Sequence, residues 1–443
     1  MNSNKLNIEC LRLISDGSGV GYMNGIATFV PGLLPGETAE VAVSKAKKKW
    51  QRASLLNVIQ RSPERIDAPC TVFEGCGGCQ LQHTTYAETL FWKQRWVEDA
   101  LTRIGKISAE VKPTLGMEHP WRYRNKARLH RLPTGELGYY KEKSKEQVNF
   151  HDCLLLSEGM NRWIKRTEEL LGEGYPEIHT LTFRENTKNE GLLIIEGMPG
   201  ESLSVPENND FFEALAKEGL RSIWNLDAEG SLQLIWGDEE FSQTILGLTF
   251  ELSPLAFLQV NSRQTDLLYK LVLDAVALTG EEIVWDLYSG IGTLTLAIAT
   301  KAMKVTAIEE NPYAVENAIQ NAVNNHAVGN IEFLKGKVEQ RMMKIEEEPD
   351  VVVLDPPRAG VHADVLQRLL ELRPQRIIYV SCDPGTLARD LGGLTAGGYK
   401  VDSVQPVDMF PWTGHVETII VLYRGWSSVK ISDRLKVETI PVY

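Results

Sequence analysis

The sequence has few cysteines, no long apolar run and no excess of positive charge, and each absence removes a class of protein. Six cysteines in 443 residues are too few for a disulfide scaffold. No run of about 18 apolar residues is present, which excludes a membrane-spanning helix. The first residues, MNSNKLNIECLRL, lack the charged start and unbroken apolar core of a secretory signal. We therefore expect a cytoplasmic protein without a membrane partner, and no protein partner is predicted.

The formal net charge is −12, so the overall basic character that is typical of nucleic-acid-binding proteins is missing. Two segments are nonetheless strongly basic. Residues 41–65 carry seven Lys or Arg against one acid, and residues 121–131 carry five and no acid. Phosphate groups respond to the local field, so an acidic protein can bind nucleic acid through such segments. Charge alone leaves a solvated surface as an equally good interpretation.

The pattern along the chain predicts an α/β protein of several domains. Residues 1–62 alternate short apolar segments with turns, which predicts a small β-barrel of oligonucleotide-binding size. Residues 63–255 hold a cysteine-bearing loop, a helix at about 84–105 that we expect to pack on the C-terminal half, and then mostly strands. Residues 256–427 alternate strands and helices, which predicts a Rossmann-like, doubly wound parallel sheet closed by an antiparallel pair. Residues 428–443 form a tail.

A glycine-rich turn follows the first strand of the α/β half. The chain reads DLYSGIGT from Asp286 to Thr293, and such a turn lets a ligand approach the backbone and the N-terminus of the next helix. The next strand ends at Glu309, at the spacing at which an acid holds ribose hydroxyls in nucleotide-binding folds. An ordinary turn and a solvated acid at a helix start explain the same residues. The two features together favour an adenosyl cofactor.

Three polar residues lie at strand ends of this sheet, where open α/β sheets bind ligands. Asp355 ends one strand, and Cys382 ends the next, just before a helix expected to begin at Pro384. The N-terminus of that helix is expected to favour the thiolate, which is the nucleophilic form of cysteine. Glu417 opens the last strand and is a candidate base. The alternatives are an inert buried cysteine and a solvated glutamate.

A second set of cysteines has the spacing C-x5-C-x2-C-x73-C and comprises Cys70, Cys76, Cys79 and Cys153. Four thiolates suit a tetrahedral zinc ion or a [4Fe–4S] cluster, and the spacing alone does not choose between them. Cys10 is left over and is expected to be inert.

Five segments together resemble the RNA uracil-5-methyltransferase family: FLQVN (257–261), DLYSGIGT (286–293), DPPRAG (355–360), SCDPGTLARD (381–390) and HVETI (415–419). The N-terminal β region also resembles the TRAM domain found in many members. The resemblance implies methylation of uracil C5 in RNA with S-adenosylmethionine as cofactor. The implied cofactor-binding residues are Gln259, Tyr288, Gly290, Thr293, Glu309 and Asp355, with Glu309 on the ribose. The sequence around Lys337 departs from the family pattern, so no adenine contact is predicted there.

The resemblance also implies Cys382 as the nucleophile and Glu417 as the base, and the chemistry agrees with these roles. Uracil C5 is a poor nucleophile, and a thiolate that adds at C6 turns the ring into an enolate whose C5 attacks the methyl group. The adduct must then lose its C5 proton to a base before the thiol leaves. The target base has to leave its stack to reach such a pocket. As RNA contacts we select Arg122, Arg124, Lys126 and Arg128.

Ribosomal-RNA members of this family carry a [4Fe–4S] cluster at this cysteine spacing, and transfer-RNA members lack it. The resemblance therefore favours the cluster, in a structural or RNA-docking role, and 23S ribosomal RNA as the substrate of a monomeric enzyme. One alternative is a transfer-RNA uracil-5-methyltransferase. A cytosine C5 methyltransferase is disfavoured by the resemblance. A non-catalytic iron–sulfur RNA-binding protein is disfavoured because Cys382 and Glu417 occur together.

Overall fold

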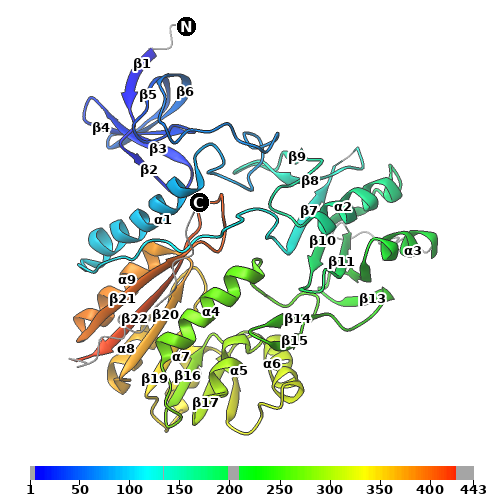
Figure 1. Cartoon of the computed structure of the whole chain (residues 1–443), viewed down its shortest axis with the longest axis vertical. Coiled ribbons are helices and arrows are strands. Elements are labelled where there is room, and N and C mark those ends of the chain that lie inside the picture. The colour runs from blue at the N-terminus through cyan, green and yellow to red at the C-terminus, as the bar shows by residue number, and fades with distance from the viewer. Residues whose placement is uncertain (1–4, 133, 198–208, 426–443) are drawn as a thin grey trace.

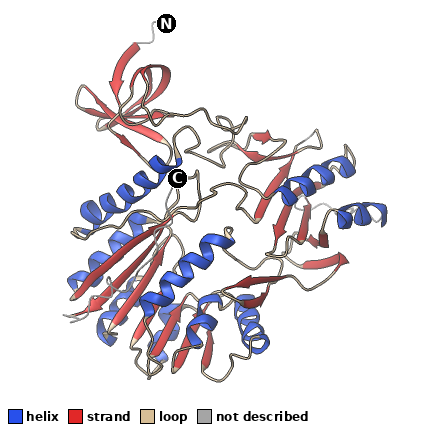
Figure 2. Ribbon diagram, in the orientation of Figure 1, coloured by secondary structure: helices blue, strands red, loops and turns tan. Residues whose placement is uncertain are grey.

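The computed structural model describes residues 5–132, 134–197 and 209–425, and they form three sheet-containing parts (Figure 1). Strands occur in every part, whereas most helices flank the C-terminal sheet (Figure 2). The predicted tail, residues 428–443, lies outside the described residues. Among the residues described, no helix has both the length and the apolar character that crossing a membrane requires.

The N-terminal part is a six-stranded sheet in the order β1-β5-β6-β4-β3-β2, which confirms the predicted β domain. Its strands are β1 (Lys5–Glu9), β2 (Arg12–Leu13), β3 (Ser18–Met23), β4 (Ile26–Pro31), β5 (Thr38–Ala46) and β6 (Trp50–Gln60). Alternate side chains such as Val30, Ala39 and Val41 point into one small core. The lysines of the first basic segment lie at the end of β5 and in the turn that leads to β6.

Helix α1 (Tyr86–Ala100) continues into a π-helical turn (Leu101–Gly105) and joins the N-terminal sheet to the C-terminal one. The hydroxyl of Thr85 caps its first turn. On one side, the indole of Trp96 donates to the carbonyl of Leu13 at 2.7 Å. The other side of the helix belongs to the hydrophobic core of the C-terminal sheet. The helix thus packs on the C-terminal half as expected.

The central part is a seven-stranded sheet in the order β13-β12-β11-β10-β7-β8-β9. Its strands are β7 (Lys126–Arg131), β8 (Leu137–Tyr140), β9 (Gln147–Asn149), β10 (Ile178–Glu185), β11 (Gly191–Gly197), β12 (Leu220–Leu226) and β13 (Leu232–Gly237). Helices α2 (Glu158–Leu171) and α3 (Asn209–Lys217) cover one face. The hairpin of β14 (Ser242–Ile245) and β15 (Leu248–Glu251) packs on part of the other face.

The C-terminal part is a seven-stranded sheet in the order β18-β17-β16-β19-β20-β22-β21, with β16 to β20 parallel and β22 antiparallel to both neighbours. Its strands are β16 (Ile283–Leu287), β17 (Lys304–Glu309), β18 (Ile331–Lys335), β19 (Val351–Leu354), β20 (Arg376–Ser381), β21 (Tyr399–Val407) and β22 (Glu417–Arg424). This topology confirms the predicted doubly wound sheet and its antiparallel closure.

Helices cover both faces of the C-terminal sheet. One face carries α4 (Ser262–Val276), α5 (Thr293–Ala299) and α6 (Pro312–Asn324). The other carries α1, α7 (Val338–Arg341), α8 (Ala363–Leu372) and α9 (Pro384–Ala396). The sequence did not predict α7, which spans a single turn and gives no periodic signal.

Candidate functional site

The sheet topology brings the predicted nucleophile and base together. Strands β20 and β22 are antiparallel, and Ser381 at the end of β20 is the partner of Thr418 near the start of β22. Cys382, which follows Ser381, therefore lies beside Glu417, which precedes Thr418. Asp355 follows the neighbouring strand β19 and reaches the same edge. Three residues that are far apart in the sequence thus meet at one point.

The two carboxyl groups of this cluster bind protons unusually tightly. Burial raises the pKa of Glu417 to about 8, with a further contribution from Asp355 and an opposing one from Arg358. Burial and the charge of Asp286 raise the pKa of Asp355 to about 7. Both pKa values lie near neutrality, so the pair exchanges protons in the pH range where a general base is most effective.

The thiol of Cys382 differs from the sequence expectation. Burial raises its pKa to about 11, and the charges of Glu417 and Asp355 add to this effect. Only Arg358 and a backbone hydrogen bond oppose it. Cys382 does stand directly before the capping residue of α9, as predicted, but burial and two carboxylates outweigh the helix N-terminus. The prediction that this position favours the thiolate is therefore wrong for the ligand-free site.

The last residues of SCDPGTLARD hold the DPPRAG loop in place. The carboxylate of Asp390 accepts a hydrogen bond from the backbone of Val361 at 2.9 Å. The guanidinium of Arg389 donates to the carbonyl of Ala359 at 2.9 Å. The two motifs are therefore one structural unit, in which α9 fixes the loop that follows Asp355. Sequence reasoning did not assign these positioning roles, because the partner loop is about 30 residues away in the chain.

The glycine-rich turn has an unusual backbone that leaves room for a ligand. Tyr288, Gly290 and Gly292 all have positive φ, at 69°, 55° and 83°, and for a bulky residue such as Tyr288 this marks a constrained site. A Cβ built on Gly290 meets no atom within 4 Å. The hydroxyl of Ser289 is buried and has no hydrogen-bond partner among the described residues. Open space beside an unpartnered donor fits a bound cofactor, and Ser289 was not predicted.

Glu309 fixes this turn and retains capacity for a ligand. One carboxylate oxygen accepts from the backbone of Gly290 at 3.0 Å, and the other accepts from Asn311 at 2.8 Å. A carboxylate accepts about four hydrogen bonds, so sites remain for ribose hydroxyls. Thr293 begins α5, and its hydroxyl shares a 3.0 Å hydrogen bond with Tyr269. Glu309 and Gly290 are therefore in direct contact, and Thr293 lies at the start of the helix that follows the turn.

The FLQVN loop closes the site from the central part. Gln259 is buried, and its carbonyl accepts from the side chain of Asn125 at 3.3 Å. The buried guanidinium of Arg184, on β10, donates to the carbonyls of Ser253, Pro254 and Ala256 just before the loop. Phe257, in contrast, is 76% exposed. An exposed phenylalanine in this loop is a candidate contact for a nucleobase, and sequence reasoning missed it.

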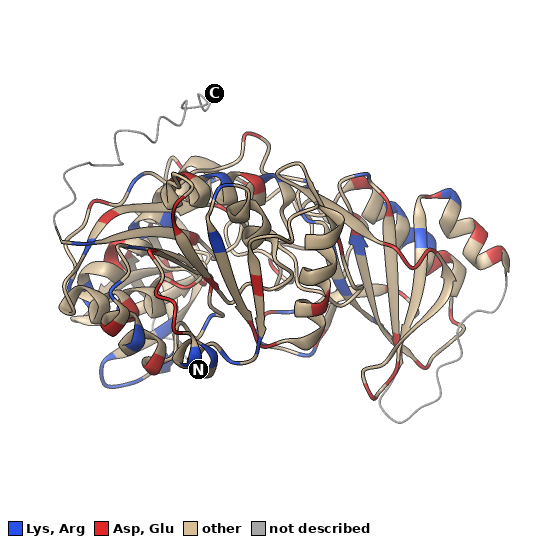
Figure 3. Ribbon diagram, turned by 90° about the horizontal axis from the view of Figure 1, so that it is seen from below, with Lys and Arg blue, Asp and Glu red and all other residues tan. Residues whose placement is uncertain are grey.

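The four selected RNA-contact residues have different environments. Arg122 is held by Asp152 at 2.7 Å and by the carbonyl of Cys153. Arg128 pairs with Glu196 at 2.7 Å but remains largely exposed. Burial and neighbouring arginines lower the pKa of Lys126 to about 8. The remaining residue, Arg124, lines the cavity of the second cysteine set. Figure 3 shows acidic and basic residues interspersed over the ribbon.

The lysines of the first basic segment lie at the tip of the β5–β6 hairpin. Lys45, Lys47, Lys48 and Lys49 are all exposed there. The ammonium groups of Lys45 and Lys47 lie 6.0 and 5.6 Å from the ring of Trp50. Lysines around an aromatic ring combine phosphate attraction with a stacking surface, which suits single-stranded nucleic acid.

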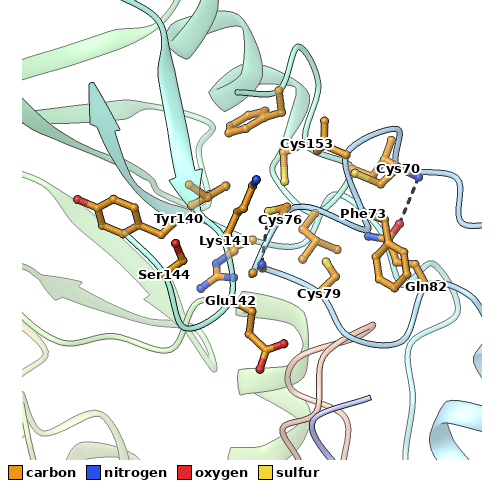
Figure 4. Close-up of a pocket in the computed structure, with 18 of the residues that line it drawn as sticks. Cys70, Phe73, Cys76, Cys79, Gln82, Tyr140, Lys141, Glu142, Ser144 and Cys153 are labelled. Atoms are coloured by element: carbon orange, nitrogen blue, oxygen red, sulfur yellow. Dashed lines mark hydrogen bonds between the residues drawn. The ribbon is translucent and has the colours of Figure 1, made fainter. Parts of the chain in front are cut away.

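The second cysteine set lies around one cavity. Cys70, Cys76, Cys79 and Cys153 all line one cavity of about 460 Å³ between the cysteine loop and the central sheet (Figure 4). The side chain of Gln82 accepts a hydrogen bond from the backbone of Cys70 at 3.3 Å. Burial raises the pKa of the Cys79 thiol to about 12. Within the described ranges, no three His, Cys, Asp or Glu side chains are grouped closely enough to hold a metal ion.

The order of the strands, the glycine-rich turn, Glu309 and the polar residues at the carboxyl edge of the sheet are typical of one class of protein. This class is the S-adenosylmethionine-dependent methyltransferases. Comparison with known proteins narrows this class. Residues 246–425 match the family model described as tRNA (Uracil-5-)-methyltransferase, and residues 5–56 match the TRAM domain.

Relatives match the chain along almost its whole length. An uncharacterized RNA methyltransferase of Halalkalibacterium halodurans is 40% identical, over 93% of this chain and 95% of its own. One of Listeria innocua is 37% identical, also over 93% and 95%. The crystal structure of Pyrococcus abyssi tRNA (uracil-54, C5)-methyltransferase in complex with S-adenosyl-L-homocysteine superposes with a TM-score of 0.74 at 26% identity, over 94% of this chain and all of that one. The chain therefore belongs to the S-adenosylmethionine-dependent RNA (uracil-5-)-methyltransferase family and is an enzyme.

Proposed function

We propose that this enzyme methylates C5 of a uridine in 23S ribosomal RNA, with Cys382 as nucleophile and Glu417 as base. The observation that carries the proposal is the placement of these two residues side by side at the paired ends of β20 and β22. A thiol and a buried carboxyl group at one point are what addition at C6 and proton removal at C5 require.

The proposed reaction has two chemical stages. The Cys382 sulfur forms a bond to uracil C6, the ring becomes an enolate, and C5 takes the methyl group from the sulfonium, which releases S-adenosylhomocysteine. Glu417 then accepts the C5 proton, and the electron pair restores the C5–C6 double bond as the C6–S bond breaks. A pKa of about 8 makes the Glu417 carboxylate a stronger base than an ordinary glutamate. The Cys382 thiol, whose pKa is about 11, must first lose its proton to a group other than Glu417, because Glu417 has to be unprotonated to accept the C5 proton.

We further propose that the methionine-derived cofactor lies over the glycine-rich turn. Tyr288, Gly290 and Thr293 would border it, and Glu309 would accept from the ribose hydroxyls. Gln259 and Asp355 would lie at its reactive end, where Asp355 can also fix the uracil edge. The open space at Gly290 and the unpartnered Ser289 hydroxyl support this assignment.

For the second cysteine set, we propose a [4Fe–4S] cluster. A zinc ion holds its sulfur ligands about 2.3 Å from one centre, whereas a cluster spreads them over several irons. The four thiols line one cavity of about 460 Å³, which supports a single centre held by all four. When bound, the cluster would cross-link the cysteine loop (Cys70, Cys76 and Cys79) to Cys153 of the central part.

We propose that RNA crosses the face formed by the β5–β6 hairpin and β7. Of the selected residues, Arg124, Lys126 and Arg128 lie on or beside β7, and Arg122 contributes by orienting the segment through Asp152. The predicted boundaries 1–62, 63–255 and 256–427, and a monomeric enzyme, remain part of this proposal.

Transfer RNA is the second candidate substrate, because the similar solved structure is a tRNA methyltransferase. Mapping of 5-methyluridine by mass spectrometry, in cells with and without the gene, tests both. We expect a 5-methyluridine of 23S RNA to disappear. Disappearance from transfer RNA instead would retain the chemistry and reject the ribosomal substrate, and no change in either RNA would reject the function.

The mechanism has its own test. Glu417→Gln should stop the reaction after methyl transfer, so that a covalent protein–RNA complex accumulates and survives a denaturing gel. Cys382→Ala should abolish both methylation and the complex while RNA affinity is retained. Methylation by Cys382→Ala would disprove covalent catalysis.

A further inference from the structure

We propose that Gln80 is a positioning residue that couples the cysteine loop to residues 408–416, the segment that leads into Glu417. The inference rests on the proposed roles of the cysteines and of Glu417. Gln80 directly follows Cys79, yet most of its hydrogen bonds reach a segment more than 300 residues away. Segment 408–416 is therefore a place where changes at the cysteine centre can reach the reactive edge.

Gln80 binds this segment through both its backbone and its side chain. Its backbone amide and that of Leu81 donate to the carbonyl of Trp412 at 3.0 and 3.1 Å. Its side-chain oxygen accepts from the backbone of Gly414 at 3.1 Å. Its side-chain nitrogen donates to the carbonyl of Gly77, also at 3.1 Å. One amide side chain thus bridges the CGGC turn and the segment before the catalytic base.

Trp412 needs this support because its own backbone is unfavourable. Its φ is 67°, in a region that bulky residues rarely occupy. Such a conformation persists only where surrounding contacts over-determine it. The indole stacks on Trp121 with centroids 4.4 Å apart and donates to the carbonyl of Pro120 at 2.9 Å. The backbone amides of Gln80 and Leu81 complete these contacts. A change in the cysteine loop therefore acts on a residue whose backbone conformation depends on its neighbours.

From Gly414 the contacts continue to the reactive groups. Gly414 lies so close to the N-terminal sheet that an added Cβ would stand 1.6 Å from the carbonyl oxygen of Ser15. The next residue, His415, has its ring nitrogen 3.5 Å from the guanidinium of Arg358. A series of contacts therefore leads from Gln80 through Gly414 and His415 to Arg358. The charge of Arg358 acts on Cys382 and Glu417.

Two substitutions at one position separate the bridge from the cysteines. Gln80→Leu removes both side-chain hydrogen bonds. Gln80→Glu keeps the acceptor for Gly414 and removes the donor to Gly77. Gln320→Leu is the matched control, because Gln320 lies exposed on α6 and bonds only within its helix, to Asn324. Each full-length variant is assayed for iron content, for hydrogen exchange of residues 411–416, and for kcat and KM of methyl transfer.

We expect Gln80→Leu to keep the iron content of the wild type, to exchange faster at Gly414, and to lose at least about tenfold in kcat with little change in KM, since displacements near 1 Å at a reactive centre have effects of this size. Gln80→Glu should recover most of kcat, and Gln320→Leu should match the wild type. Unchanged exchange or unchanged kcat in Gln80→Leu would overturn the inference. Loss of iron in parallel with kcat would overturn it too, and would assign Gln80 to cluster retention.

Failure of the proposed function gives a different result. If the wild type forms no 5-methyluridine in any RNA, the function is rejected, and hydrogen exchange alone then decides whether Gln80 holds segment 408–416. Unchanged protection of Gly414 in Gln80→Leu would reject the coupling in that case as well.

Discussion

Replacing Glu417 by Gln should stabilise the folded protein, and the gain should grow with pH. The carboxyl group is 4% exposed, and its pKa is about 8 against an ordinary value of 4.5. As pH rises from 4.5, the unfolded chain releases this proton first, so the folded state loses stability until pH passes about 8. Glutamine carries no titrating proton and escapes this loss.

The size of the effect follows from the pKa difference. Each pKa unit corresponds to about 1.4 kcal/mol, so the buried carboxyl lowers the unfolding free energy by about 1 kcal/mol at pH 5 and about 4 kcal/mol at pH 8. The difference between the two pH values, about 3 kcal/mol, does not depend on how well the amide packs, since any packing penalty is the same at both.

Thermal unfolding at pH 5 and pH 8 measures this difference. We expect the melting temperature of Glu417→Gln, relative to wild type, to be higher at pH 8 than at pH 5 by roughly 5 °C or more. Glu316→Gln, at an exposed position of α6, is the control and should show no such dependence. A shift that is equal at both pH values, or larger at pH 5, would refute the assignment of a high pKa to Glu417.

Three further predictions concern other parts of the molecule. Iodoacetamide should modify Cys382 about 100-fold more slowly than a thiol of pKa 9.0 at neutral pH, because a pKa of about 11 leaves correspondingly less thiolate; mass spectrometry of the peptide measures the rate. Lys93→Met strands the fully buried Asp408, whose carboxylate lies 2.5 Å from the ammonium, and should lower the unfolding free energy by about 3 kcal/mol or more in thermal unfolding; wild-type stability in the variant would show that this ion pair does not stabilise the fold. Replacing Lys48 and Lys49 by Ala should reduce the salt dependence of RNA binding, the slope of log K against log salt, by roughly 1.4, and an unchanged slope would remove the hairpin from the RNA interface.

The sequence predicted the C-terminal fold well because its signals are local. Strands such as VVVL before Asp355 and RIIYVS before Cys382 are continuous apolar runs, and a helix cap or glycine turn follows each. Local patterns of this kind fix strand and helix identity, and the right-handed connections then fix their order. The convergence of Cys382 and Asp355 followed from the same reasoning.

What the sequence did not predict depends on contacts between distant segments. The high pKa of Cys382 arises from burial and, in addition, from the carboxyl groups on two other strand ends, which no local pattern reveals. Arg122 was selected as an RNA contact, but Asp152 holds its guanidinium. No local sequence pattern reveals the bridge made by Gln80, because its partners Trp412 and Gly414 are more than 300 residues away.

Helix α1 fixes the distance between the N-terminal sheet and the catalytic sheet. Near its C-terminal end the helix is bound to the N-terminal sheet through Trp96 and Leu13 and through the Arg12–Asp99 ion pair, and Val97, Ala100 and Leu101 at the same end pack in the core of the catalytic sheet. The distance between the lysine hairpin and the reactive edge is therefore set by protein rather than by a linker. An RNA that touches both must carry its target base at a matching separation from the phosphates that the hairpin grips. With the hairpin as the proposed RNA contact, selection would depend on the folded shape of the RNA, and a uridine at another distance from those phosphates would not reach the site.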